Sequence, residues 1–231
     1  MPEWMSYSLS DALMFSPRVY YRLIELYNEA VAPAQVLTIG LGIAMLAAFF
    51  RPGDSGFRFG AIALGVSWLW VSYGFLWERF ATINWPISYV VPFTVLQGLM
   101  LIGFGVSGAG LSLPARRSIT TAAGLILFAA AVILYPFIAP LVDRPWAAAE
   151  IFGLMPDPTA IATLAFLAIA AGGVRWLLMI IPVLWCAISS VMLWTMGSAD
   201  YVIPLAGALV AVAIGLTNPW RTERRAGVRA D

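Results

Sequence analysis

The sequence predicts an all-α membrane protein, a bundle of about seven transmembrane helices with an amphipathic helix at its N-terminal end. Hydrophobic residues make up 61% of the 231 residues and charged residues only 11%, whereas an average soluble domain carries about 25% charged residues. The apolar residues form blocks, each close to the roughly 20 residues that cross a hydrocarbon core. Because no polar linker divides these blocks, we expect a single integral membrane domain over residues 1–231.

Seven apolar windows are the predicted spans. They cover residues 31–50, 60–77, 87–106, 119–139, 159–174, 176–196 and 201–217. The fifth and seventh windows are the shortest, and six spans is the alternative count. Local signals support the boundaries: Asp157 before Pro158 has the pattern of an N-cap, Ser118 can cap the fourth span, and Ser198 or Asp200 can cap the seventh.

Two further helices are expected outside the spans. Residues 16–30 form the amphipathic helix, which is predicted to lie in the membrane interface or against the bundle. Its charged residues recur at helical spacing and share one stripe: Arg18, Arg22, Glu25 and Glu29. A short helix over residues 145–152 is the second, because a proline begins this segment and Gly153 follows it.

The distribution of arginine predicts the orientation. The chain has no lysine, so all 13 basic residues are arginines. With seven spans, one side holds nine of them and the other side holds four, namely Arg18, Arg22, Arg79 and Arg144. The positive-inside rule therefore places residues 218–231 in the cytoplasm as a tail and the N-terminus outside. The expected location is the bacterial cytoplasmic (inner) membrane.

Several classes of function are excluded by missing residues. None of the 25 charged residues (13 basic and 12 acidic) falls inside a window, which predicts an uncharged interior and argues against an ion-coupled transporter. Without lysine there is no retinal Schiff base, and without histidine there is no histidine-ligated haem or metal. Cys186 is the only cysteine and cannot form an intrachain disulfide or a thiolate metal cage. We expect no cofactor and no metal, and no residue is assigned a catalytic role.

Two sets of polar residues are the candidate binding sites. Four uncharged ones lie at membrane depth: Ser72, Tyr73, Gln97 and Ser189. They either line a path for a solute or form hydrogen bonds between helices, which is the commoner role. Five acidic ones lie in connections on the outer side: Glu78, Asp143, Glu150, Asp157 and Asp200. They either bind a cation or a basic partner, or serve as helix caps and solvated surface.

Several short segments resemble an uncharacterised bacterial family of small multi-pass membrane proteins, a domain of unknown function sometimes labelled a permease. The N-terminal ones are Phe15-Ser16-Pro17-Arg18, Tyr20-Tyr21-Arg22, Leu26-Tyr27-Asn28 and Pro33-Ala34-Gln35. Later ones are Thr82-Ile83-Asn84, residues 156–163, and the run from Ile181-Pro182 to Trp185. In that family a cysteine often precedes the proline at Pro158, whereas this chain has Asp157. The resemblance implies a membrane bundle and brings no catalytic residues.

Three functions fit these observations. The first is a non-enzymatic accessory, assembly or scaffold component, because the windows carry no charge. The second is a permease for a neutral or lipid-like small molecule, which requires Ser72, Gln97 and Ser189 to meet at one cavity. The third is an enzyme at the outer face, which requires two of the acidic residues in a cleft. The expected partners are the lipid bilayer and another membrane protein, and not nucleic acid.

Overall fold

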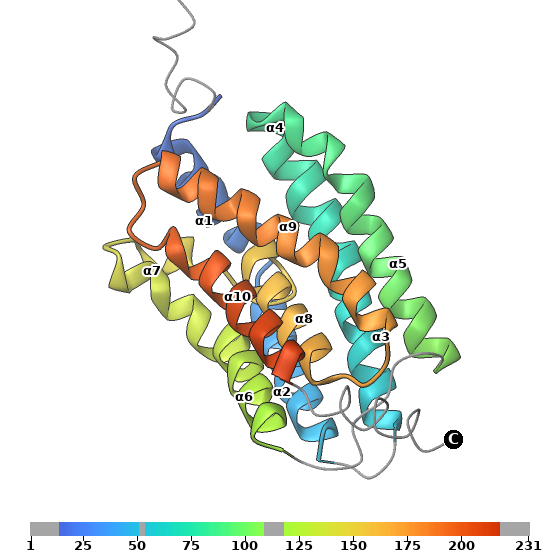
Figure 1. The fold of residues 1–231 in the computed structure, drawn as a ribbon. Coiled ribbons are helices and arrows are strands. Elements are labelled where there is room, and N and C mark those ends of the chain that lie inside the picture. Colours follow the sequence, from blue (N-terminus) through green and yellow to red (C-terminus); the bar gives the residue numbers. More distant parts are fainter. Residues whose placement is uncertain (1–13, 51–53, 109–117, 218–231) are drawn as a thin grey trace, which may run out of the picture.

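The computed structural model describes residues 14–50, 54–108 and 118–217, and within these ranges the chain is helical with short connections. Figure 1 shows the helices packed side by side in one bundle. Helices α1, α4 and α7 lie at one end of this bundle, which we call the α1 end, and the last turns of α5 lie at the other. The predicted all-α fold is confirmed.

Helix α1, Pro17–Ala30, is the predicted amphipathic helix. Its first turn is capped by Ser16, whose side chain accepts a hydrogen bond from Val19 N, and the proline there has no N–H to leave unpaired. The buried side chains are Tyr20, Ile24, Tyr27 and Asn28. The charged stripe faces away from them, so α1 packs its apolar face against the bundle.

Helix α2, Ala34–Ala48, does not continue the direction of α1. The two helices meet at an angle of 86° across a break of three residues that includes Pro33. Proline lacks the N–H that would continue the hydrogen-bond ladder, which accounts for a break at this point. Helix α1 therefore lies across the end of the bundle, and α2 runs along it.

The next two helical runs form a closely packed pair. Helix α3, Ser55–Trp70, continues through a π-helical segment η3, Val71–Phe80, into the short α4, Ala81–Ile83. The chain returns through the 3₁₀ segment η4, Trp85–Tyr89, and α5, Val91–Ser107. Where the two runs cross, Gly65 on α3 and Gly98 and Gly105 on α5 let the backbones approach.

The following run ends at the α1 end and leads into a buried connection. It comprises α6, Ile119–Ala129, the π segment η5, Ala130–Leu134, the 3₁₀ segment η6, Tyr135–Phe137, and α7, Ile138–Leu141. The Ser118 cap is confirmed, since its side chain accepts a hydrogen bond from Thr121 N.

The predicted helix over residues 145–152 is wrong. One 3₁₀ turn forms there, η7, Trp146–Ala148, and the backbone is extended at Ala149. The backbone carbonyls of Ala147 and Ala149 accept hydrogen bonds from the amide of Asn28 on α1, at 2.8 and 2.9 Å. These two carbonyls are therefore paired with α1, and they do not accept the backbone hydrogen bonds that a helix within the segment would form.

Helix α8, Pro156–Ile169, is the centre of the bundle. Every residue in it is buried, and so is the whole stretch 148–171. It packs against α3 and α6 and against the last two helices. These are α9 (Val174–Thr195) and α10 (Val202–Thr217). At its C-terminal end the buried guanidinium of Arg175 donates to the carbonyls of Ala170 and Gly215, which satisfies acceptors that the helix leaves open.

The predicted count of seven spans is not confirmed. In the described part of the chain, four helical runs are long and apolar enough to cross a membrane, and the bent pair of α1 and α2 makes a fifth if it is one span. They are Ser55–Ile83, Trp85–Ser107, Ile119–Leu141 and Val174–Thr195. Helices α8 and α10 are apolar but shorter; at 1.5 Å per residue α8 extends about 21 Å, less than a hydrocarbon core of about 30 Å.

Candidate functional site

A cluster of buried charged residues lies at the α1 end, where the connections after α7 and α9 meet the start of α8. Asp157 is at its centre and is only 2% exposed. Its carboxylate accepts three hydrogen bonds, from Trp185 Nε1 at 2.7 Å, from Ser189 Oγ at 2.6 Å and from the Tyr135 hydroxyl at 3.3 Å. Three donors satisfy much of the hydrogen-bonding capacity that burial would otherwise leave unmet.

The prediction that Asp157 is an N-cap is wrong. Helix α8 begins one residue earlier, at Pro156, so Met155 occupies the cap position and Asp157 lies in the first turn. Its side chain is turned toward α9, where Trp185 and Ser189 are four residues apart and therefore share a face. The carboxylate thus joins α8 to α9, and it does not cap its own helix.

Asp200 was also predicted as a possible helix cap, and its side chain has a different role. Its carboxylate forms an ion pair with Arg144, which follows α7, and also accepts a hydrogen bond from Ser198. The guanidinium of Arg144 lies over the ring of Tyr21 on α1, 4.6 Å from its centroid, and the Tyr21 hydroxyl bonds Ser198 at 2.7 Å. These contacts join α1 to the connections after α7 and α9.

Glu150 completes the cluster. It is 5% exposed and comes from the buried connection before α8. Burial raises its pKa well above the ordinary value of 4.5, the carboxylate of Asp157 raises that pKa further, and Arg144 opposes the rise. Arg144, placed among these carboxylates, has a raised pKa of its own and stays charged.

The expectation of an uncharged interior is therefore wrong. The described part of the chain buries four charged residues: Glu150, Asp157, Arg175 and Asp200. Asp157, Arg175 and Asp200 lie within two residues of a predicted window, whereas Glu150 lies in the middle of a connection that folds into the buried core. Among the described residues, no group of three or more His, Cys, Asp or Glu side chains is arranged to hold a metal ion.

The structure brings some predicted site residues together and separates others. Glu150, Asp157, Asp200 and Ser189 belong to the cluster, whereas Glu78 and Asp143 are exposed. Ser72 donates a hydrogen bond to Thr94 between η3 and α5, Gln97 donates one to the Leu178 carbonyl between α5 and α9, and Tyr73 is 63% exposed. The convergence of Ser72, Gln97 and Ser189 on one cavity, which a permease would need, is not observed.

Sequence reasoning missed four members of the cluster: Tyr21, Tyr135, Arg144 and Trp185. Arg144 served as a marker of orientation, and Tyr21 and Trp185 were noted only within the segments that resemble the family. The four-residue spacing of Trp185 and Ser189 is the one signal that could have found a shared polar face. Their partner Asp157 lies on another helix, and no spacing along the chain indicates that contact.

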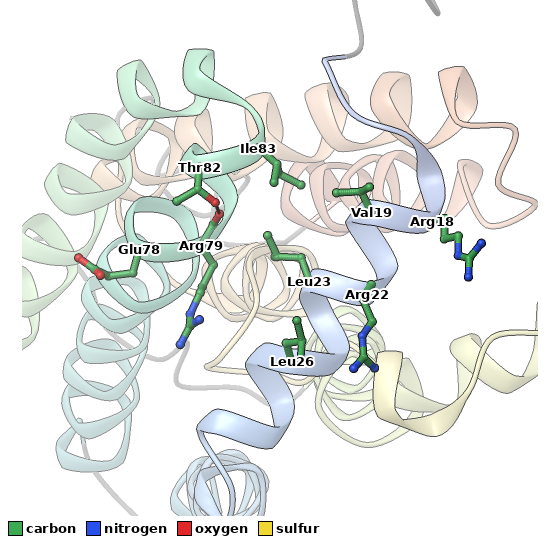
Figure 2. A pocket seen from close by; sticks show the side chains of 9 residues that line it. All are labelled: Arg18, Val19, Arg22, Leu23, Leu26, Glu78, Arg79, Thr82 and Ile83. Atoms are coloured by element: carbon green, nitrogen blue, oxygen red, sulfur yellow. Dashed lines mark hydrogen bonds between the residues drawn. The ribbon is translucent and has the colours of Figure 1, made fainter.

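Two surface grooves flank α1, and the second of them includes Tyr21 and Arg144 of the cluster. The α1–α4 groove has a volume of about 510 Å³ and is lined by Arg18, Val19, Arg22, Leu23, Leu26, Glu78, Arg79, Thr82 and Ile83. The α1–α7 groove has a volume of about 600 Å³ and is lined by Arg18, Tyr21, Arg22, Glu25, Asp143, Arg144 and Pro145. Figure 2 shows Leu23, Leu26 and Ile83 between α1 and α4 with Arg79 beside them, whereas Arg22 extends from the opposite side of α1.

The fold and the site define an all-helical protein with several apolar helices long enough to span a membrane and a charged cluster at one end of the bundle. The chain belongs to a family of unknown function, DUF6064, whose family model matches residues 17–226. No curated protein and no solved structure matches the chain.

Proposed function

We propose that the protein is a non-enzymatic component of the bacterial cytoplasmic membrane, an accessory, assembly or scaffold subunit that binds a membrane protein partner at its α1 end. In this proposal the bundle is multi-pass, with the N-terminus outside and the C-terminus in the cytoplasm. The α1 end then faces outward, and the lipid bilayer surrounds the apolar helices.

One observation carries the proposal: the polar side chains at depth are used in helix packing, and the buried carboxylates gather at one end. Ser72 and Gln97 each complete a different helix contact with a hydrogen bond of 2.8 or 3.0 Å. Such bonds hold bundles together and line no path. By contrast, the α1 end combines a buried ion pair with two open grooves, which is a rigid surface suited to binding.

The alternatives have less support. A permease for a neutral or lipid-like molecule needs a shared cavity for Ser72, Gln97 and Ser189, and these residues lie at separate interfaces. An outer-face enzyme needs carboxylates open to a substrate, whereas Glu150 and Asp157 are almost fully covered.

Site-specific photo-crosslinking in native membranes tests the proposal. A photoreactive amino acid replaces Trp85 or Trp146, which are 55% and 56% exposed at the α1 end, or Ile119, which is 90% exposed at the opposite end. We expect a discrete protein adduct from Trp85 or Trp146 and none from Ile119. Adducts of equal yield from all three positions, or none from the α1 end, would contradict the proposal.

A further inference from the structure

The carboxyl groups of the charged cluster differ in what they contact. Asp157 accepts hydrogen bonds from three side chains, and Asp200 is paired with Arg144 and Ser198. In the described part of the chain, Glu150 has neither a hydrogen-bond donor nor an ion-pair partner, although it is only 5% exposed. A buried carboxylate without a partner is far less stable than the neutral acid. Glu150 is therefore the member of the cluster that holds a proton.

Arg144 lacks acceptors in the same way that Glu150 lacks donors. Its Nη2 atom pairs with Asp200, whereas its Nε and Nη1 atoms are buried and meet no acceptor among the described residues. Arg144 and Glu150 interact electrostatically across the cluster. Loss of the proton from Glu150 would create the acceptor that these two nitrogen atoms lack, and the attraction between two buried ions is screened little by water.

Arg144 also contacts α1. Its guanidinium lies over the Tyr21 ring, 4.6 Å from the centroid, and the Tyr21 hydroxyl bonds Ser198 at 2.7 Å. Because the donors of a guanidinium form a rigid plane, a movement of Arg144 toward Glu150 takes it away from this ring. Tyr21 and Arg144 both line the α1–α7 groove, so water reaches the cluster on this side when α1 loosens.

The groups around Glu150 come from each element that forms the cluster. They are Tyr20 and Tyr21 on α1, Tyr135 on η6, Arg144 after α7, Asp157 on α8 and Asp200 after α9. A tyrosine hydroxyl ordinarily keeps its proton up to about pH 10. The donors to Asp157 and the guanidinium beside Asp200 favour the charged forms of these two carboxyl groups. Glu150 is thus the group whose protonation changes most readily near neutral pH.

We propose that Glu150 is a pH-sensitive latch for α1. With a proton on Glu150, Arg144 pairs with Asp200 and contacts Tyr21, and α1 is held against the bundle. When Glu150 releases the proton, Arg144 turns toward it and α1 loosens. The inference rests on the proposed function in one respect: a partner at the α1 end would bind the two states with different affinity.

Distances between spin labels, measured by double electron–electron resonance in detergent, test the latch. The labels are attached at Val19→Cys on α1 and Gly103→Cys on α5 in a Cys186→Ser background. Val19 is 44% exposed, and a Cβ on Gly103 meets no atom within 4 Å. We expect a narrow distance distribution at about pH 5 and a broader or shifted one at about pH 9, where Glu150 is ionised. Glu150→Gln cannot ionise and should keep the narrow distribution at both pH values.

Two controls separate the latch from other effects of pH. Glu29→Gln removes an exposed carboxylate from α1 itself and should keep the wild-type response. Labels at Gly40→Cys on α2 and Gly103→Cys, where the added side chains also meet no neighbour, should report the same distance at both pH values.

The latch is overturned by any of four results. These are a wild-type α1 distance that does not depend on pH, a wild-type response in Glu150→Gln, a lost response in Glu29→Gln, and an equal change in the α2–α5 distance. The crosslinking test of the proposed function uses a single pH and positions Trp85 and Trp146. Its outcome is independent of the spin-label distances, so the two proposals fail separately.

Discussion

At the scale of single residues, the carboxylates of Asp157 and Asp200 are each matched by hydrogen-bond donors or by an opposite charge. The Arg144–Asp200 pair is typical: removing either member leaves the other buried without its partner, which costs about 3–5 kcal/mol in comparable sites. Asp157 is held by hydrogen bonds from three side chains. Glu150 is different, because burial and a neighbouring carboxylate both oppose its ionisation.

Glu150 makes the stability of the protein depend on pH. Its pKa is raised above 4.5 in the folded state, so the folded protein holds a proton that the unfolded chain releases between 4.5 and the raised pKa. The free energy of unfolding therefore falls as pH rises through this window, by up to about 1.4 kcal/mol per pH unit. Glu150→Gln has no such proton. We expect the melting temperature of the wild type, measured in detergent, to fall more steeply from about pH 5 to about pH 8 than that of Glu150→Gln; parallel curves would contradict this.

The sequence was sufficient to place these carboxylates at one end, but not to show which of them are buried. Glu78, Asp143, Glu150, Asp157 and Asp200 are all predicted on the outer side. Whether a carboxylate turns inward depends on a donor from another element, such as Trp185 for Asp157. The Asp157-Pro158 pattern was misleading, because Pro156 fits the first helical turn equally well.

At the scale of elements, the pairing of α3 and α5 depends on glycine at the crossing. A Cβ on Gly98 would lie 2.8 Å from the Gly65 carbonyl oxygen, and a Cβ on Gly65 would lie 2.6 Å from the Gly98 oxygen. Both obstacles are backbone atoms, which cannot move without separating the helices. On the same helix as Gly98, a Cβ on Gly103 would meet no atom within 4 Å, so Gly103 has no part in the close approach of the two helices.

Gly98 and Gly103 form a matched pair for mutation. Gly98→Ala should lower the free energy of unfolding by about 1–3 kcal/mol, because the added methyl forces the α3 and α5 backbones apart. Gly103→Ala should be neutral or raise it by up to about 1 kcal/mol, since alanine is the better helix former and meets no neighbour. Thermal unfolding of both variants in the same detergent measures the difference. Equal effects would show that the crossing tolerates a side chain.

Predictability differs between elements for a physical reason. Helix α1 was predicted with its charged stripe, because residues close together in the chain encode that stripe. The connection before α8 was predicted as a helix and is mostly not one, because its backbone bonds to Asn28, more than 100 residues away in the chain. Helix α8 is apolar on all sides, which is typical of a helix surrounded by others.

At the scale of the whole molecule, the number of membrane crossings depends on α2, α8 and α10, which are shorter than the four long runs. Helix α8 is buried throughout and has polar contacts at both ends, from Asp157 and from Arg175. A helix covered by protein can end inside the hydrocarbon layer, because its neighbours satisfy the backbone groups that lipid cannot. Seven crossings, with the α1 end outside, therefore remain a prediction.

Labelling of single cysteines measures the direction of the bundle and tests whether α2 and α8 cross the membrane. Cys186 is buried, so a Cys186→Ser parent provides an unlabelled background for Glu29→Cys, Asp54→Cys and Gly173→Cys. Glu29 precedes α2, Asp54 follows it, and Gly173 follows α8. With seven crossings, an impermeant maleimide should label Glu29→Cys in intact cells, and should label Asp54→Cys and Gly173→Cys only after permeabilisation. The reverse labelling pattern would show that the bundle has the opposite orientation in the membrane. Labelling of Gly173→Cys from outside would mean that α8 enters the membrane and returns, because its two ends would then open to the same side.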